Sequence, residues 1–242
     1  MKRIIAICAL IAGLPAYSAG EGPASGVIPE NCTAYLTVQQ ANCIVSHYLT
    51  CDEDAEGLRW RLLMDRDGPF MQTKTDTEYR WLQTTWIETG FEARLLEPET
   101  DPASLSELLE TGRDQYSFER EYYDGGVPVG HFKFQGYDAL SGETAVIDGE
   151  TLLVTQYEFS TFDADGVQFA RNYGQQYVHP EHRLFFGGNE FEVDAEGHVT
   201  PGFYAPITFS EPGESGFLDD TPRYGCDALM SNLAQTSPEK ES

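Results

Sequence analysis

The sequence predicts a mainly β protein, either an antiparallel sandwich or an incomplete β-barrel, with one short helix at about 102–111 and two disulfides. Three observations predict this fold. Apolar and polar residues alternate in many short runs, as they do in strands with one buried face. Gly, Asp, Asn and Pro separate the runs at the spacing of strand turns. The chain has 5 Cys, and removal of an N-terminal leader leaves an even number.

The N-terminus predicts export. Two basic residues precede an apolar run, Ile4–Ala16, and a small-residue cleavage site ends at Ser18. This arrangement is typical of a secretory signal peptide, and the run is too short to span a membrane. We therefore expect a periplasmic or secreted protein with no membrane span after cleavage. The predicted parts are a signal peptide at 1–18, a flexible N-terminus at 19–29, one β-rich domain at 30–229 and a disordered tail at 230–242.

The charge of the chain excludes two classes of partner. Asp and Glu number 40 against 15 Lys and Arg, and the formal net charge is −25. A field of this sign repels nucleic acid and anionic lipid, so we expect neither as a partner. The chain also has no nucleophile elbow, phosphate-binding loop or dinucleotide fingerprint, and no cofactor is expected. The oligomeric state stays open.

The first predicted element is a β-hairpin, with strands over 32–39 and 43–51 and a two-residue turn at 41–42. The pairs that this register places opposite each other are Cys32–Cys51, Ala34–Leu49, Leu36–His47 and Val38–Val45. The apolar faces coincide only in this register, because a slip by one residue would turn one strand over. We therefore expect a Cys32–Cys51 disulfide. Cys43 then pairs with Cys226, across most of the chain.

A third strand is expected at 58–64, with Arg59 and Arg61 pointing outward. Its inward residues are Leu58, Trp60, Leu62 and Met64. Residues 77–87 fit either a strand or a helix, and 91–96 fits a short strand.

One helix stands out after these strands. Asp101 is a typical N-cap, Pro102 suits the first helical position and Gly112 supplies a C-terminal stop. Its leucines make a narrow apolar stripe. We expect the helix to cover an end or an edge of a sheet.

From residue 115 onward the pattern is that of strands and turns. The stretch 151–188 predicts an antiparallel meander, because two β-branched and aromatic runs flank an Asp/Gly turn and a Pro turn leads to a third. We expect this meander at the centre of the sheet. Residues 203–209 predict a last strand that Pro206 interrupts, and therefore an edge strand.

Histidine and carboxylate clusters give weak chemical signals. His179 and His182 are weak metal candidates, because they are three residues apart across a Pro turn, whereas a zinc-protease pair needs positions i and i+4 on a helix. A hydrogen-bonded core position is expected for His47. The runs at 163–166 and 194–197 resemble the start of a calcium loop but lack its spacing and closing Glu, so strand turns are expected there. With so many Asp and Glu, their proximity in sequence identifies no catalytic pair.

Aromatic residues give the best binding signal. They make up 12% of the chain and fall mostly in predicted strands. Most should be core, but the mouth of a half-open barrel lined by such rings is a common ligand site. The predicted ligand-binding residues are Trp60, Tyr157, Phe159, Phe169 and Tyr173.

Two longer motifs carry a resemblance. The first combines Cys32, Cys43-x-Val-Ser-His47 and Cys51 with Gly57-x-Arg-Trp60. The second runs Tyr177-Val-x-Pro-Glu-x-Arg-Leu-Phe-Phe-Gly-Gly188. Together they resemble uncharacterised exported proteins of alphaproteobacteria, a group that implies export but no activity and no catalytic residue. The layout of the second half is similar to that of periplasmic lipid-carrier-type β half-barrels.

Three functions remain open at this point. The favoured one is a non-enzymatic periplasmic β domain that binds a small apolar ligand or an envelope component. The second is a structural or interaction protein of the cell envelope. The third is a metal- or carboxylate-dependent hydrolase. The sequence identifies no catalytic residue, however, and we therefore favour a protein without enzymatic activity.

Overall fold

The structure is a computed structural model that describes residues 28–227. The predicted signal peptide at 1–18, most of the segment 19–29 and the predicted tail at 230–242 lie outside the described residues. The elements are β1 Cys32–Gln40, β2 Ile44–Cys51, β3 Arg59–Asp65, β4 Gly68–Thr75, β5 Trp81–Trp86, β6 Phe91–Asp101, α1 Leu105–Thr111, β7 Arg113–Asp124, β8 Val127–Ile147, β9 Glu150–Phe162, β10 Gln168–His179, β11 Leu184–Asp194, β12 Val199–Phe203 and β13 Pro206–Ser210. None of the helices in this part of the chain has the length and hydropathy needed to cross a membrane.

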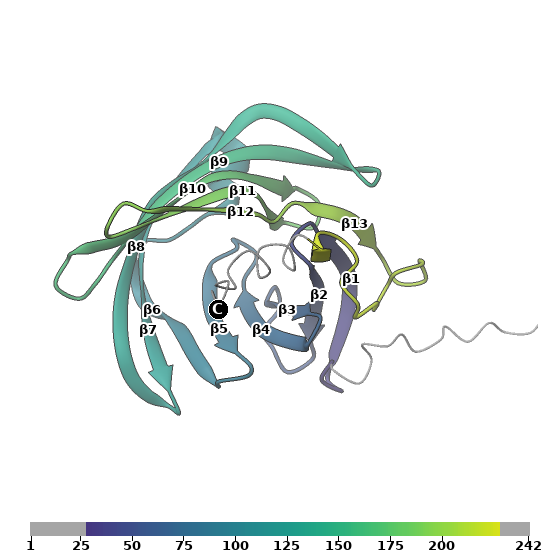
Figure 1. Ribbon diagram of the computed structural model, residues 1–242, viewed down its shortest axis with the longest axis horizontal. Helices are drawn as coiled ribbons and strands as arrows, with labels where there is room; N and C mark the ends of the chain where they lie inside the picture. Colours follow the sequence, from purple (N-terminus) through teal and green to yellow (C-terminus); the bar gives the residue numbers. More distant parts are fainter. Residues whose placement is uncertain (1–27, 228–242) are drawn as a thin grey trace, which may run out of the picture.

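All strands join one antiparallel sheet, which confirms the predicted fold class. The 13-stranded sheet has the order β12-β11-β10-β9-β8-β7-β6-β5-β4-β3-β2-β1-β13. Each strand therefore pairs with its neighbour in sequence, except that β13 returns to pair with β1. The sheet curls around an interior (Figure 1), so the incomplete barrel, rather than the sandwich, is the form that the chain adopts.

A two-residue link joins the opposite edges of the sheet. The predicted strand at 203–209 is in fact two strands, because β12 ends at Phe203 and Pro206 opens β13 at the other edge. Proline, which lacks an N–H, is tolerated at the first residue of an edge strand. The Tyr204 N–H donates to Gly188 O (2.8 Å), while Ala205 O accepts from the Ala41 N–H (2.9 Å). Three peptide units span at most about 10 Å, so the two edges lie close together here.

Side chains from the two ends of the sheet complete the barrel. Leu36 and Val38 of β1 and Tyr48 of β2 pack against buried residues of β9 and β11, among them Leu152 and Phe186. The Tyr48 and Phe186 rings meet edge to face, with centroids 5.9 Å apart. This core holds the curl of the sheet, since residues far apart in sheet order are buried together.

Both predicted disulfides are present. Cys32 bonds to Cys51 over a sequence separation of 19 residues, and Cys43 bonds to Cys226 over 183 residues. Disulfides persist in oxidising compartments, so the pair indicates a protein outside the cytoplasm.

The register behind this prediction was only half right. The turn has three residues rather than two, with Cys43 in the left-handed region (φ 61°). A bulge between Ala34 and Leu36 shifts the pairing back by one residue, so Cys32 still faces Cys51. Beyond the bulge the predicted pairs were wrong, because Leu36 faces Tyr48, rather than His47, and Val38 faces Ser46, rather than Val45. Three-residue hairpin turns of this kind place their last residue in the left-handed conformation.

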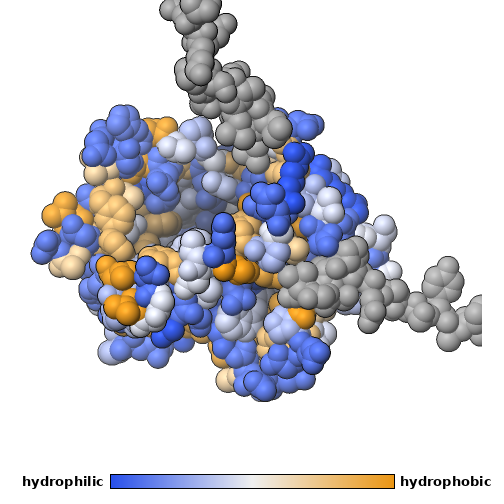
Figure 2. Space-filling model, turned by 60° about the horizontal axis from the view of Figure 1, so that its bottom comes forward, coloured by the Kyte–Doolittle hydropathy of each residue, from blue (hydrophilic) through white to orange (hydrophobic). Residues whose placement is uncertain are grey.

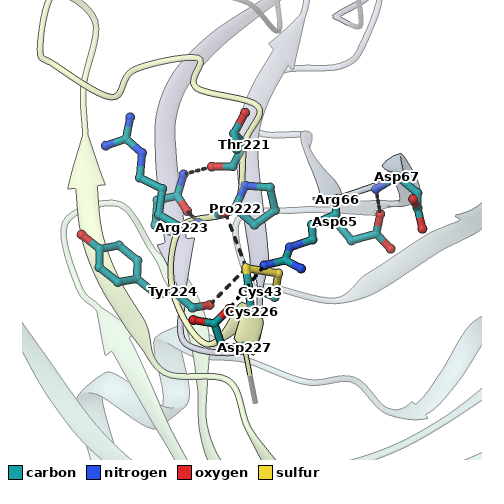
Figure 3. The surroundings of a disulfide bond; sticks show 11 residues. Cys43, Asp65, Arg66, Asp67, Thr221, Pro222, Arg223, Tyr224, Cys226 and Asp227 are labelled. Carbon is teal, nitrogen blue, oxygen red and sulfur yellow. Dashed lines mark hydrogen bonds and ion pairs between the residues drawn. A yellow bond between two sulfur atoms is a disulfide. The ribbon is translucent and has the colours of Figure 1, made fainter. Parts of the chain in front are cut away.

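Residues 211–227 bond to the outer face of β1, and we call β1–β3 together with this segment the stapled region. Gln39 donates through Nε2 to Thr221 O and accepts through Oε1 from the Arg223 N–H, both at 3.0 Å. The segment ends beside the Cys43–Cys226 bond, as Figure 3 shows. Gly225 is required at this approach, because a Cβ there would lie 1.6 Å from Ala41 O.

His47 is buried within the stapled region. Its Nδ1 lies 3.0 Å from Thr37 Oγ1, and its side chain is fully excluded from solvent. Burial lowers the pKa of His47 to about 4, against a smaller raising effect of Asp220. The prediction of a hydrogen-bonded core histidine is confirmed.

The helix starts later than predicted. Ser104 is the N-cap, and its side chain accepts from the Glu107 N–H. Asp101 was wrongly predicted as the cap, because it ends β6 and pairs with Ser117 of β7. The predicted stop at Gly112 is confirmed, with φ 85°. The buried helix leucines pack with Val178, so α1 covers the ends of several strands.

Two further expectations are resolved. The ambiguous segment 77–87 contains a strand, β5, rather than a helix. The stretch 151–188 forms β9, β10 and β11, which pair antiparallel as predicted. These strands lie next to the β12 edge, however, and not at the centre of the sheet.

Candidate functional site

The curved sheet encloses a cleft of about 460 Å³ that adjoins a smaller chamber of about 70 Å³. The two spaces share a wall made of Tyr79, Trp81, Tyr157, Phe159, Gln176 and Phe185. On the hollowed face in Figure 2, hydrophobic (orange) surfaces lie among hydrophilic (blue) ones. Strands from both halves of the chain supply the lining, so the site depends on the curl of the whole sheet.

Trp81 organises the aromatic wall. Its ring meets Phe118, Phe134 and Phe159 edge to face, with centroids 6.0, 6.5 and 6.1 Å apart. These rings come from β7, β8 and β9. Gly136 permits the packing, because a Cβ there would lie 2.5 Å from Phe159 Cβ and 2.2 Å from a carbonyl oxygen of β9. Edge-to-face rings hold one another in place, so the wall is preorganised.

Two arginines line the cleft, and the sequence predicted the wrong side for one of them. Arg61 was expected to point outward, but it faces the cleft together with Arg120. Leu62 and Met64, expected to point into the barrel, instead pack with Val45 on the opposite face, the same face from which Gln39 bonds to the C-terminal segment. Both faces of β3 are covered, so alternation alone could not decide which face looks into the barrel.

An acidic pair lies at the end of the chamber. Asp114 of β7 and Asp138 of β8 stand opposite each other in the sheet, and both line the chamber. Burial raises the pKa of Asp114 to about 6 and that of Asp138 to about 7, and the charge of Asp114 adds to the effect on Asp138. The Ser104 N–H donates to Asp114 Oδ2 (2.9 Å), while Oδ1 has no partner in the described part of the chain. Carboxyls of this kind hold or release a proton near neutral pH.

No pattern in the sequence pointed to this acidic pair. Asp114 and Asp138 are two of 40 acidic residues, and only the β7–β8 register brings them together. The two aspartates could have been recognised as neighbours only if β7 and β8 had been aligned in the correct register.

The structure separates the predicted ligand-binding residues. Tyr157 and Phe159 line the cleft. Trp60 lies elsewhere, donating through Nε1 to Asp54 Oδ2 (2.7 Å). Phe169 is partly exposed and contacts Phe132, and Tyr173 stacks on a neighbouring ring of β11. The binding role of these aromatic residues stays a prediction.

His179 and His182 do come together, beside acidic side chains. His179 Nε2 lies 3.1 Å from Glu150 Oε2, and His182 Nε2 lies 3.3 Å from Glu211 Oε1. The His182 N–H donates to His179 Nδ1 (3.2 Å), so Nε2 of the neutral ring carries the proton and donates to Glu150. With one nitrogen accepting and the other protonated, this ring offers no lone pair to a metal ion. The arrangement favours a hydrogen-bonded turn.

A second acidic cluster lies in the turn between β11 and β12. Ligand atoms of Asp194, Glu196 and His198 lie within 4.8 Å of one another, and all three residues are exposed. His198 Nδ1 is 2.9 Å from Asp194 Oδ2, and the Asp194 carboxylate also accepts from the His198 N–H (2.8 Å). These bonds are those of the strand turn that the sequence predicted.

Comparison with models of protein families finds no match, and comparison with curated proteins finds none. Among solved structures, the chain is similar to the hypothetical lipoprotein YmcC from Escherichia coli (K12). The TM-score is 0.41 and the sequence identity is 13%, over 74% of this chain and 88% of that chain. The resemblance to exported alphaproteobacterial proteins stays a prediction.

Proposed function

We propose that this protein is a non-enzymatic binding protein of the periplasm whose cleft holds a small apolar ligand. The observation that carries the proposal is the aromatic-walled cleft of about 460 Å³ inside the curl of the sheet. Small-molecule sites in proteins typically have volumes of roughly 300–1,000 Å³ and are lined mainly by apolar and aromatic side chains. The predicted signal peptide, the disulfides and the predicted resemblance to exported alphaproteobacterial proteins support the periplasm as its compartment.

The packing of the wall supports binding without rearrangement. Trp81 is fixed by three phenylalanine rings, and Tyr79 reaches across to donate to Phe185 O (3.1 Å). A ligand that enters the cleft replaces water at surfaces that are already ordered. Preorganised sites lose less conformational entropy on binding, which raises affinity.

A fluorescent titration tests the proposal. The neutral apolar probe N-phenyl-1-naphthylamine gains fluorescence when it leaves water, and Trp81 in the wall provides a second signal. The blocking variant is Thr73→Phe, because Thr73 lines the cleft. The matched control is Thr50→Phe, because Thr50 is an exposed strand residue outside it.

We expect saturable binding of one probe per chain to the wild type and to Thr50→Phe. We expect Thr73→Phe to bind about tenfold more weakly or worse, because the added ring occupies ligand volume. Equal binding by all three proteins, or no binding to the folded wild type, would overturn the proposal.

An exposed apolar patch at one end of the sheet supports a second candidate function. Val127 and Val129 follow the β7–β8 turn and are 62% and 56% exposed, and Val167 in the β9–β10 turn is 59% exposed. Phe169 and Phe132 join the two turns through a ring contact with centroids 5.1 Å apart. Such patches are typical of protein interaction sites, which fits an interaction protein of the envelope.

Cross-linking in the periplasm tests this second function. A Val127→Ser/Val129→Ser variant should lose a cross-linked envelope partner that the wild type captures, while its binding of the apolar probe stays unchanged. A wild-type protein that gives only monomer after cross-linking would rule the second function out.

A further inference from the structure

The charges in the cleft are arranged differently from those on the rest of the protein. Arg61 and Arg120 line the cleft, and neither lies within ion-pair distance of a carboxylate in residues 28–227. Elsewhere in the protein, by contrast, Arg80 pairs with Asp76 and Glu99. In a chain with a formal net charge of −25, carboxylates are plentiful, so two lining arginines without one are unexpected.

Arg120 is the more informative of the two. Its side chain comes from β7 and the residue is only 4% exposed. Nη2 donates to Thr84 Oγ1 (2.9 Å) and to Ala93 O (3.0 Å), both neutral acceptors. Nε has no acceptor within the described residues. Burying a guanidinium without a counter-charge costs stability, and the cost is offset when a ligand supplies the missing anion.

Arg61 faces the same space from β3. It donates through Nε to Ser46 Oγ (3.2 Å) and through Nη2 to Gln40 Oε1 (3.1 Å), again neutral acceptors. Thr73 pairs with Arg61 on one side and with Thr84 on the other. Arg61 and Thr84, which holds the Arg120 guanidinium, are therefore two strand spacings apart, or about 10 Å.

Three carboxyls share this space, and burial disfavours the ionised form of each of them. Glu190 lines the cleft, and burial raises its pKa, against lowering effects that include Arg61. The pKa values of Asp114 and Asp138 in the adjoining chamber are raised to about 6 and about 7. Burial therefore works against the ionised form of these three carboxyls, whereas arginine keeps its proton in proteins. None of the three lies within ion-pair distance of Arg61 or Arg120 in residues 28–227, so neither guanidinium is neutralised by direct contact.

We propose that the cleft binds an amphiphile with one acidic headgroup, a carboxylate or a phosphate, on an apolar chain. Arg120 receives the headgroup and Arg61 adds to the positive field, while the chain lies against the aromatic wall around Trp81. This inference rests on the proposed function, because it names the class of ligand that the same cleft takes. Charge-assisted bonds from a guanidinium to an acid in a water-poor site are stronger than bonds between neutral groups.

The test compares ligands that differ only in their headgroup. Decanoate, decyl phosphate, decan-1-ol and decylammonium are titrated at pH 7.5 by displacement of N-phenyl-1-naphthylamine. The wild type is compared with Arg120→Met, which keeps the bulk of the side chain, and with Arg113→Gln. Arg113 is the matched control, because it is exposed, stacks on Tyr137 and has no ion pair in the described residues.

We expect decanoate or decyl phosphate to bind the wild type at least about tenfold more tightly than decan-1-ol, with decylammonium weakest. The preference for an acid should vanish in Arg120→Met and persist in Arg113→Gln. The ratio of decanoate to decyl phosphate affinity separates a fatty-acid type of ligand from a phosphate type.

Two outcomes separate this inference from the proposed function. If decan-1-ol binds as tightly as the two acids, the cleft is an apolar site and the headgroup inference is wrong. If none of the four ligands displaces the probe from folded wild type, the proposed function fails with it. Retention of the acid preference in Arg120→Met would also overturn the role of Arg120.

Discussion

The stapled region and the cleft use buried polar groups in opposite ways. In the stapled region the covered face of β1 and β2 carries neutral side chains, and the C-terminal segment bonds to them, as at Gln39 and Thr37. The cleft and its chamber bury charged or titratable groups, such as Arg120 and Asp138, without an oppositely charged partner in residues 28–227.

This difference shows where the protein gives up stability. Covalent and neutral hydrogen-bonded contacts stabilise a fold at little cost, whereas an unpaired buried charge destabilises it. Groups of the second kind, gathered around a cavity, are typical of functional sites. We therefore assign a stabilising role to the stapled region and propose the cleft as the place where a ligand binds.

The largest expected effect is loss of the long disulfide. The double variant Cys43→Ser/Cys226→Ser releases a loop of 183 residues, which the chain-entropy model values at about 5 kcal/mol. Cys32→Ser/Cys51→Ser releases 19 residues and should cost about 3 kcal/mol. Urea denaturation measures both free energies of unfolding. A larger loss from the short loop would show that the covalent link to the C-terminal segment is not the main source of stability in the stapled region.

The next largest effect is expected from two arginine variants, which compare an arginine that has carboxylate partners with one that lines the cleft. Arg80→Met leaves Asp76 and the almost fully buried Glu99 carboxylate without their partner, and it should cost about 2–3 kcal/mol. Arg120→Met removes a buried charge that has no carboxylate partner in residues 28–227. Its free energy of unfolding should stay within about 1 kcal/mol of the wild type. Equal destabilisation by both variants, measured by thermal and urea unfolding, would make Arg120 a structural residue.

The sequence predicted the stapled region better than the cleft, for physical reasons. The Cys32–Cys51 pairing follows from alternation over a short hairpin, and it survived because the longer turn and the bulge at Ala34 offset each other. The direction of Arg61 depends on which face of β3 turns toward the interior of the curled sheet, and both faces carry buried residues. Asp114 and Asp138 meet only through the β7–β8 register. Local patterns determine strands and turns, whereas the cleft is made by contacts between residues distant in sequence.

The chamber should make the protein less stable as pH rises. The pKa of Asp138 is raised from 3.8 to about 7, so the folded state binds the proton more tightly than the unfolded state. The stability that this gives is fully present below pH 4 and is lost as pH rises toward 7. Asp138→Asn should remove the loss and raise the free energy of unfolding at pH 8 on the order of 2 kcal/mol. An unchanged pH profile would contradict the burial of this carboxyl.

The stapled region should respond to pH in the opposite direction, with a smaller effect. The pKa of His47 is lowered from 6.5 to about 4, so the unfolded state binds the proton more tightly. Stability is full above pH 6.5 and falls as pH drops toward 4. In His47→Gln, the loss of unfolding free energy between pH 6.5 and pH 4 should be smaller by an amount on the order of 1 kcal/mol. Acid denaturation followed by circular dichroism checks the slope, and an identical slope in the variant would place the titration elsewhere.

The most direct test of the cleft is native mass spectrometry of the protein exported to a bacterial periplasm and purified without detergent. We expect a bound amphiphile at one copy per chain, carried by the wild type and by Thr50→Phe. It should be absent from Thr73→Phe, whose added ring fills the cleft. Detection of the wild type only at the mass of the chain without a ligand would contradict a ligand-binding role for the cleft. An adduct that Thr73→Phe retains in full would contradict it as well.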